Sequence, residues 1–187
     1  MNEIATAADT NRARALRAAL MIVGTQGIRG LTHSRVDVFA ELPRGSTSNY
    51  FRTRASLLHG VVDHLATTEL VTFAGGVQPQ TVEELVKALT GFVREATGPG
   101  RTLAAARLVF FTEAFHDPEI RGPLEQARDR VHTSAAQILE LLGVSRPFEA
   151  AQRVLAYVDG AILQGLVFGD VAGVERDLDA VVRSCLA

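Results

Sequence analysis

The segment that most constrains the fold covers residues 32–51 and reads THSRVDVFAELPRGSTSNYF. Thr32 stands where a helix N-cap belongs, because its hydroxyl can accept hydrogen bonds from the free backbone N–H groups at a helix start. A short helix is expected over residues 34–40. The turn follows at Leu42-Pro43, since proline cannot continue a helix but suits the first position of the next one. That next helix is expected over residues 44–50.

A longer amphipathic helix is expected ahead of this segment, over residues 11–25. Its apolar side chains recur at three- and four-residue steps, which places them on one face. Gly27 and Gly30 then turn the chain. Three helices in this order, with small polar residues on the third, predict a helix-turn-helix, the arrangement that brings a recognition helix into the major groove of DNA. The alternative is a plain helical hairpin with a solvated Ser/Thr loop.

The third helix carries side chains suited to reading DNA. Arg44 can bond a guanine edge or a phosphate, Asn49 can read adenine, and the methyl group of Thr47 can touch a thymine methyl. Gly45 allows a close backbone approach. Ser46 and Ser48 are expected to be exposed beside these residues, Tyr50 and Arg54 are placed to bind phosphates, and His33 either faces DNA or is simply exposed.

Charge is distributed unevenly along the chain. Residues 1–60 hold eight Arg and four acidic side chains, a net charge of +4. Residues 61–187 hold 11 basic and 17 acidic side chains, a net charge of −6, so the chain total of −2 hides a basic end and an acidic body. This polarity favours a DNA-binding head with salt-dependent affinity, although uneven scatter of surface charge would give the same split.

The residues of this first third resemble the TetR family of bacterial transcriptional repressors. The resemblance covers about residues 11–58 and rests on Gly30-Leu-Thr, Leu42-Pro-Arg-Gly-Ser, Asn49-Tyr-Phe, and Arg54 ahead of Leu57-Leu. It implies an all-α, dimeric regulator that binds double-stranded operator DNA. With the resemblance included, the expected DNA-binding residues are Thr32, His33, Ser34, Arg35, Arg44, Gly45, Ser46, Thr47, Ser48, Asn49, Tyr50 and Arg54.

Three residues depart from the pattern of the family. Asp37 occupies a place usually held by a small apolar residue, so it needs a partner, for which Arg35 or Arg44 is a candidate. Glu41 stands where a turn glycine is common, and Ser48 stands where many members carry an aromatic residue. Each departure is expected to weaken or redirect contacts with DNA.

The rest of the chain predicts helices only, about nine in the whole chain. After the third helix they are expected over residues 54–73, 81–96, 102–116, 118 or 123 to 142, 148–168 and 174–186. Thr81-x-x-Glu84 has the spacing of a capping box. We expect two domains, a helix-turn-helix DNA-binding domain over residues 1–58 and an effector-binding and dimerisation domain over residues 59–187.

The last two helices are expected to form a homodimer interface. The helix over residues 148–168 is apolar almost all round and must be buried on more than one side. This helix and the last one, together with the same two helices of a second copy, would form a four-helix interface. The alternative is a monomer in which the helix over residues 148–168 is buried in the core of its own chain. The expected interface residues are Val154, Val158, Ile162, Gly165, Leu166, Leu178, Val181, Val182 and Cys185.

A small-molecule effector, apolar or aromatic, is implied by the resemblance, which places effectors inside the helical body and lets them change the spacing of the two heads. Aromatic and polar side chains of the body are candidates for its pocket, although an aromatic residue at helical spacing is more often core. The candidates are Phe73, Phe92, Phe110, Phe111, Thr112, Phe115, His116, Tyr157, Gln164 and Phe168.

Other classes of protein receive little support. No run of 18 apolar residues predicts a membrane span, the first ten residues lack the pattern of a secretion signal, and the single Cys185 fits a reducing cytoplasm. No spacing indicates a metal site, a cofactor or a catalytic group. The sequence therefore predicts a cytoplasmic TetR-like regulator, a repressor released from its operator by an effector. An all-α ligand-binding protein or enzyme that ignores DNA sequence is the alternative.

Overall fold

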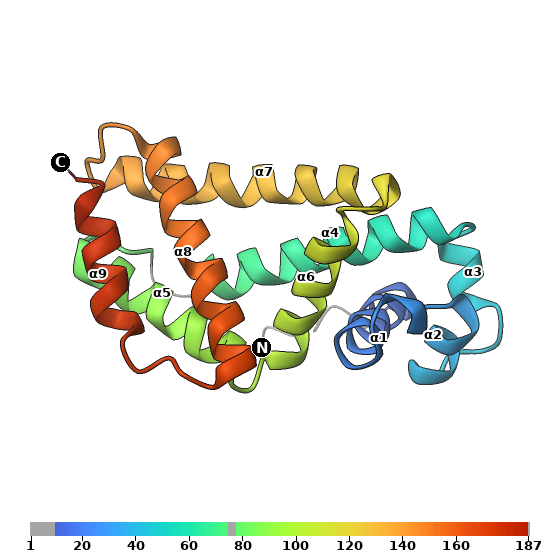
Figure 1. The fold of residues 1–187 in the computed structure, drawn as a ribbon. Helices are drawn as coiled ribbons and strands as arrows, with labels where there is room; N and C mark the ends of the chain where they lie inside the picture. The colour runs from blue at the N-terminus through green and yellow to red at the C-terminus, as the bar shows by residue number, and fades with distance from the viewer. Residues whose placement is uncertain (1–9, 75–77, 187) are drawn as a thin grey trace, which may run out of the picture. The chain divides into compact units, whose positions relative to one another are not determined.

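The structure, a computed structural model, describes residues 10–74 and 78–186, with side chains throughout these ranges except at residues 71–74. Within them the chain forms nine α-helices and one short 3₁₀ helix, with no β-strand (Figure 1). The predicted all-α class is confirmed. No helix of the described part is both long enough and apolar enough to cross a membrane.

The helices follow one another closely along the chain. Their bounds are α1 Asn11–Gln26, η1 Ile28–Gly30, α2 His33–Phe39, α3 Ser46–Tyr50, α4 Arg54–Ala74, α5 Val82–Thr97, α6 Arg101–Glu113, α7 Pro118–Leu141, α8 Pro147–Phe168 and α9 Val174–Ser184. The predicted helices agree with these bounds closely except at two places: α6 ends at Glu113 instead of residue 116, and α3 begins at Ser46 instead of residue 44. Gly45 causes the later start of α3, because its φ of 88° lies in the left-handed region and ends the turn there.

The described chain divides into two compact units. One contains the residues up to 65 together with 105–124, and the other contains residues 66–104 and those from 125 onward. Helices α4, α6 and α7 each contribute residues to both units. The division predicted between residues 58 and 59, into a DNA-binding domain and an effector-binding and dimerisation domain, stays a prediction.

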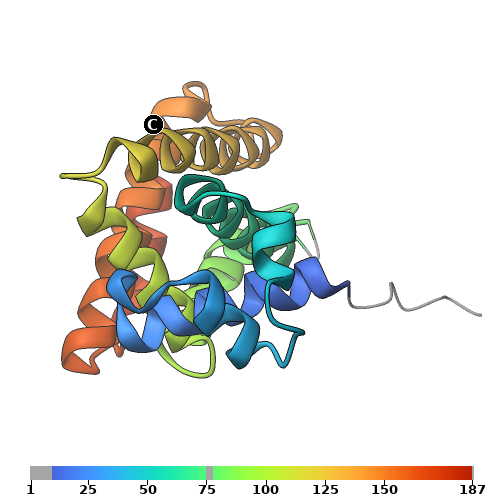
Figure 2. The ribbon, with the colours of Figure 1, turned by 90° about the vertical axis from the view of Figure 1, so that its right-hand side faces the viewer.

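In the first unit, α1, α2 and α3 contact one another around a small apolar core (the blue to cyan helices of Figures 1 and 2). Leu31 and Val36 are fully buried there, and Phe51 closes the core just after α3. The guanidinium of Arg12 lies 5.2 Å from the centre of the Phe51 ring. The predicted N-cap of α2 is confirmed, since the Thr32 hydroxyl accepts a hydrogen bond from the backbone N–H of Arg35.

In the second unit, α5, α8 and α9 lie side by side and supply most of the core (Figure 1). Val93, Ile162 and Leu178 are completely enclosed between these helices. The N-terminus of α5 carries the predicted cap, because the hydroxyl of Thr81 accepts from the N–H of Glu84. The Glu84 carboxylate in turn accepts from the N–H of Gln80, one residue earlier than in a standard capping box.

Candidate functional site

Helix α3 and the turn before it present a row of exposed polar side chains. Arg44, Ser48, Asn49 and Tyr50 are all exposed. Ser46 is half-buried, and its hydroxyl donates to the carbonyl of Pro43 at 2.6 Å. This row has the chemistry of a base-reading surface, since Arg and Asn match guanine and adenine edges and hydroxyl groups bind either bases or phosphates.

Thr47 does not belong to this row, although it was predicted to contact DNA. Its side chain is 0% exposed, and its hydroxyl donates to the carboxylate of Asp37 at 2.5 Å. The structure encloses the methyl group of Thr47 in the core, and its predicted contact with a thymine methyl stays a prediction. This burial could not be predicted from the sequence, because a helix of five residues is too short to define an inner face by periodicity.

Asp37 finds partners other than the arginines suggested by the sequence. Its Oδ2 accepts from the backbone N–H of Gly45 at 2.7 Å, and its Oδ1 accepts from the backbone N–H of Thr47 at 2.7 Å as well as from the Thr47 hydroxyl. The carboxylate is buried. Burial raises the pKa of Asp37, but the hydrogen bonds from Thr47 and Gly45 outweigh it and hold the pKa below the ordinary value of 3.8.

The turn between α2 and α3 is held from α1 as well. The guanidinium of Arg14 donates to the carbonyl of Ala40 at 2.6 Å and to that of Glu41 at 3.2 Å, where helix α2 leaves its carbonyl groups unpaired. Glu41 has a φ of 52°, the left-handed conformation that favours glycine. The chain therefore keeps the turn geometry of a glycine at a position occupied by glutamate.

Three other predicted DNA contacts have partners inside the head. The Nε2 of His33 lies 2.7 Å from the carbonyl of Phe51, so this ring nitrogen donates to it. Arg54 donates to the carbonyl of Leu31 at 2.7 Å while remaining exposed. Arg35 is hydrogen bonded through its guanidinium to the side chain of Gln26. These side chains fix the ends of α2, α3 and α4, and their DNA contacts stay predictions, as do those of Thr32 and Ser34.

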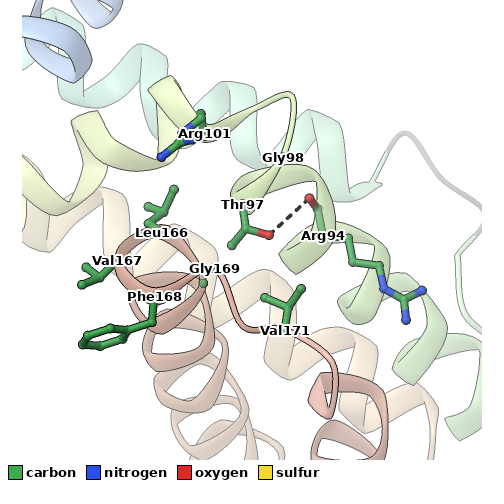
Figure 3. A pocket seen from close by; sticks show the side chains of 10 residues that line it. Arg94, Thr97, Gly98, Arg101, Leu166, Val167, Phe168, Gly169 and Val171 are labelled. Carbon is green, nitrogen blue, oxygen red and sulfur yellow. Dashed lines mark hydrogen bonds between the residues drawn. The ribbon is translucent and has the colours of Figure 1, made fainter.

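The second unit contains a cavity of about 580 Å³ (Figure 3). Its lining residues come from the end of α5, the start of α6, the end of α8 and the segment after it: Arg94, Thr97, Gly98, Arg101, Gly165, Leu166, Val167, Phe168, Gly169 and Val171. Arg94 forms an ion pair with Glu175 at 3.5 Å. Among the residues that the structure describes, no carboxylate pairs with Arg101. The cavity thus combines an apolar wall with a cation that has no counter-ion in the described part of the chain.

The effector residues predicted from the sequence lie in both units. Phe110, Phe111, Thr112, Phe115 and His116 belong to the first unit, whereas Phe92, Tyr157, Gln164 and Phe168 belong to the second. Phe110 is fully buried and serves as core, and only Phe168 lines the cavity of Figure 3. The side chain of Phe73 lies outside the described residues. Whether the remaining residues bind a ligand stays a prediction.

The predicted dimer interface falls largely on the inner side of α8 and α9. Seven of its nine residues are buried within their own chain: Val154, Val158, Ile162, Gly165, Leu178, Val182 and Cys185. In the single chain these seven residues offer little surface to a second copy, and their part in a dimer interface stays a prediction. Leu166 and Val181 are half-buried. The outer face of α8 carries other apolar residues, including Leu163 and Val167, which are 45% and 61% exposed.

A helical head with an exposed third helix, followed by a helical body, defines the chain as a transcriptional regulator of the helix-turn-helix class. Residues 80–187, more than half of the chain, match the family described as "Tetracyclin repressor-like, C-terminal domain". The chain therefore belongs to the TetR family of transcriptional regulators, as its first third predicts. A search of curated protein sequences finds no match to this chain.

Solved structures of similar proteins share the fold. A transcriptional regulator from Rhodococcus sp. Rha1 has a TM-score of 0.74 at 19% identity, covering 95% of this chain and 96% of its own. A TetR-family member from Streptomyces coelicolor A3 has a TM-score of 0.74 at 24% identity, covering 95% and 98%. The multidrug binding protein EbrR, complexed with ethidium, has a TM-score of 0.74 at 24% identity, covering 95% and 99%.

Proposed function

We propose that this regulator is a cytoplasmic repressor that binds an operator as a homodimer and leaves it when a small molecule binds the body. The observation that carries the proposal is the exposed row Arg44, Ser48, Asn49 and Tyr50 on and before α3. These side chains have the donors and acceptors that distinguish base pairs in the major groove. The proposal gives the chain a binding role and no catalytic step.

The outer face of α8 supports the homodimer. Ala156, Gly160, Leu163 and Val167 recur at four- and three-residue steps, so they form one stripe, and all four are exposed in the single chain. A Cβ atom built on Gly160 would meet nothing within 4 Å in its own chain. Small residues beside exposed apolar ones allow two copies of α8 to approach closely. A dimer would present two heads to successive major grooves, about 34–36 Å apart.

The cavity of Figure 3 supports an effector site in the second unit. Leu166, Val167 and Phe168 supply apolar surface, and Arg101 supplies a positive charge for which no described carboxylate compensates. We infer an effector with an apolar part and a carboxylate or similar anionic group, which adds a charge to the apolar or aromatic ligand expected from the sequence. Binding changes DNA affinity only if the effector has different affinities for the DNA-bound and released conformations.

The test is sequence-selective DNA binding. Duplexes selected by the protein from a random-sequence pool are compared with scrambled copies by fluorescence anisotropy, at a salt concentration of about 0.15 M. Specific binding is expected to be tighter than scrambled binding by roughly 10³ or more. Equal affinity for both duplexes would refute the operator proposal. A reporter gene with the selected site across its promoter then decides between repression and activation.

Substitution of Arg44 provides the matched control. Arg44→Ala should lower affinity for the selected duplex and leave the dimer intact, because a bidentate arginine–guanine contact is worth about 1–3 kcal/mol. Arg153→Ala removes the same charge from an exposed position in the second unit and should leave DNA binding unchanged. An equal loss in both variants would show that Arg44 acts through net charge alone.

A further inference from the structure

Helix α3 lacks the local cap that its N-terminus requires. The helix has only the five residues Ser46–Tyr50, and its N-cap is Gly45, which has no side chain to accept a hydrogen bond. The first N–H groups of any α-helix have no partner within the helix. In most helices a Ser, Thr, Asp or Asn at the N-cap supplies the acceptor. Here the acceptor must come from elsewhere in the head.

The carboxylate of Asp37 supplies it from α2. Three hydrogen bonds reach its two oxygens, one from the N–H of Gly45 and two from the N–H and hydroxyl of Thr47. Both Asp37 and Thr47 are enclosed, with 3% and 0% of their surface exposed, so no water can take over as partner. Hydrogen bonds to an ionised acceptor are shorter and stronger than neutral ones. The start of α3 is thereby fixed against α2 in both position and rotation.

The other end of α3 is fixed by α2 as well. His33, at the start of α2, donates through Nε2 to the carbonyl of Phe51, which follows the last residue of α3. The orientation of α3 is thus set by one polar contact group at each of its ends. Arg14 donates to the carbonyl groups of Ala40 and Glu41, where the turn begins. A positive side chain thus binds the turn where it leaves α2, and the negative side chain of Asp37 binds it where it enters α3.

These bonds also determine which groups remain for DNA. The N–H groups of Gly45 and Thr47 are used by Asp37, and that of Ser46 donates to the carbonyl of Pro43. Backbone N–H groups at a helix N-terminus are a common phosphate site, but here they are occupied and lie beside a negative charge. At the start of α3, contact with DNA is therefore left to side chains such as that of Arg44.

We propose that Asp37 is a positioning residue for DNA reading: its buried carboxylate holds the recognition helix at the angle at which Arg44, Ser48 and Asn49 meet the base edges. The proposal rests on the proposed operator binding and assigns Asp37 no contact with DNA. It reverses the expectation from the sequence that an acid at this position weakens the head. Without the carboxylate the exposed side chains are still present, but α3 is free to rotate away from the orientation that reading DNA requires.

The first experiment measures the helix without DNA. Amide hydrogen exchange is followed at residues 45–50 in the full-length protein and in Asp37→Asn, which keeps the side-chain volume but loses the charge. Exchange at Gly45 and Thr47 should accelerate at least tenfold, with no change in α8 or α9. Unchanged exchange at both residues would overturn the proposal, whatever the protein does with DNA.

The second experiment measures the ratio of affinities for the selected and scrambled duplexes. Asp37→Asn should weaken binding to the selected duplex at least tenfold while binding to the scrambled duplex stays the same or tightens, because phosphate attraction does not need a fixed helix. The ratio should therefore collapse. A variant that keeps the wild-type ratio refutes the proposal, and so does one in which both affinities fall equally.

Matched variants separate position from charge and from folding. Glu41→Gln removes a negative charge from the same turn but leaves the three bonds in place, so it should keep the wild-type ratio. Thr47→Val removes only the hydroxyl group, so the ratio of affinities should fall less than in Asp37→Asn. Thr47→Ser keeps the hydroxyl group and should retain the wild-type ratio.

If Asp37→Asn fails to fold, the comparison of the two Thr47 variants still tests the proposal. If the wild-type protein selects no DNA sequence, the proposed operator binding is refuted. The hydrogen-exchange experiment then still tests whether Asp37 holds α3 in place.

Discussion

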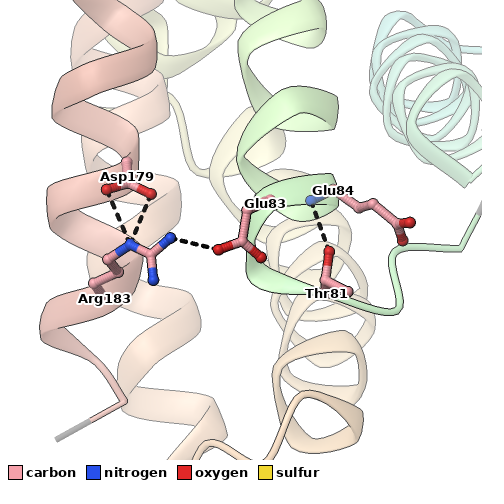
Figure 4. Close-up of polar contacts among 5 residues, drawn as sticks. All are labelled: Thr81, Glu83, Glu84, Asp179 and Arg183. Atoms are coloured by element: carbon pink, nitrogen blue, oxygen red, sulfur yellow. Dashed lines mark hydrogen bonds and ion pairs between the residues drawn. The ribbon is translucent and has the colours of Figure 1, made fainter.

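Arg183 and Glu83 are separated by 100 residues in the sequence, yet Nη2 of the arginine lies 2.6 Å from Oε1 of the glutamate (Figure 4). The same guanidinium bonds Asp179 through Nε at 2.9 Å, so one side chain links α9 to α5. Both partners are largely exposed to solvent. The ion pair therefore marks the register of two helices whose stability comes from the apolar side chains beneath it, among them Leu178.

The core beneath this ion pair should matter far more than the pair itself. Leu178→Ala is expected to lower the free energy of unfolding by about 2–5 kcal/mol, because the side chain is fully enclosed and leaves a cavity. Glu83→Gln should have a small effect at low salt that disappears at high salt, since exposed ion pairs are screened. Urea denaturation at two salt concentrations measures both. A salt-independent loss in Glu83→Gln would contradict this view.

Dimerisation through the outer face of α8 predicts a sharp contrast between two leucines. Leu163→Glu should convert the protein to a monomer, because an unpaired carboxylate would be buried between two copies of α8. Leu141→Glu introduces the same change at a leucine of α7 that is even more exposed, and it should leave the dimer intact. Size-exclusion chromatography with light scattering gives the mass of each variant. Two dimers, or two monomers, would exclude this face as the interface.

The cavity of Figure 3 predicts a preference for anionic ligands. Anilinonaphthalene sulfonate, an apolar anion that fluoresces when bound, should bind the wild-type protein more tightly than Arg101→Glu by about tenfold or more, since a hydrogen bond to a charged group is worth about 1.5–3 kcal/mol. Arg153→Glu, on an exposed face of α8, is the control and should bind like the wild type. Ethidium, a cationic probe, should not lose affinity in Arg101→Glu. Equal binding of the anion to all three proteins would refute the assignment.

His132 predicts how stability varies with pH. Burial lowers the pKa of this imidazole below its ordinary value of 6.5, the charge of Arg128 lowers it further, and Asp159 and Asp129 oppose the shift. The unfolded chain then binds the proton at a higher pH than the folded chain does. Stability contributed by the neutral ring is therefore present above pH 6.5 and is lost as the pH falls below it.

His132→Gln should reduce this loss. The melting temperature of the wild-type protein should fall between about pH 7.5 and about pH 5.5, the range in which histidine titrates, and the fall should be smaller in the variant. Burial also lowers the pKa of His64, followed by the charges of Arg17 and Arg12, so His64→Gln should remove a further part of the slope. A slope that is unchanged in the double variant would contradict the assignment.

The regular features of the fold could be read from the sequence because they depend on local chemistry. Thr32 and Thr81 cap the helices that their positions predict, since a cap involves residues only three apart. Apolar spacing likewise located most of the long helices to within a residue or two, but it placed the end of α6 three residues too late.

The sequence could not separate the two sides of an apolar helix. Val158 and Leu163 both lie on α8, and their spacing gives no indication that the first is enclosed and the second half exposed. That distinction depends on where α5 and α9 lie. The partners of Asp37 were missed for a related reason, because Thr47 follows it by ten residues across a turn whose geometry Gly45 sets. In the sequence alone, the two members of such a polar pair cannot be distinguished from two unrelated surface residues.

The pairing of Asp37 with Thr47 also has a consequence for how such heads diverge. A buried carboxylate without its donors, or a buried hydroxyl without its acceptor, costs more than either an intact polar pair or an intact apolar pair. Single replacements at either position therefore pass through an unfavourable intermediate. We expect the two positions to be inherited as a unit, so that relatives carry either an acid facing a hydroxyl or two apolar side chains, and seldom a mixture. The pair would then divide the family into lineages whose recognition helices are held by different chemistry.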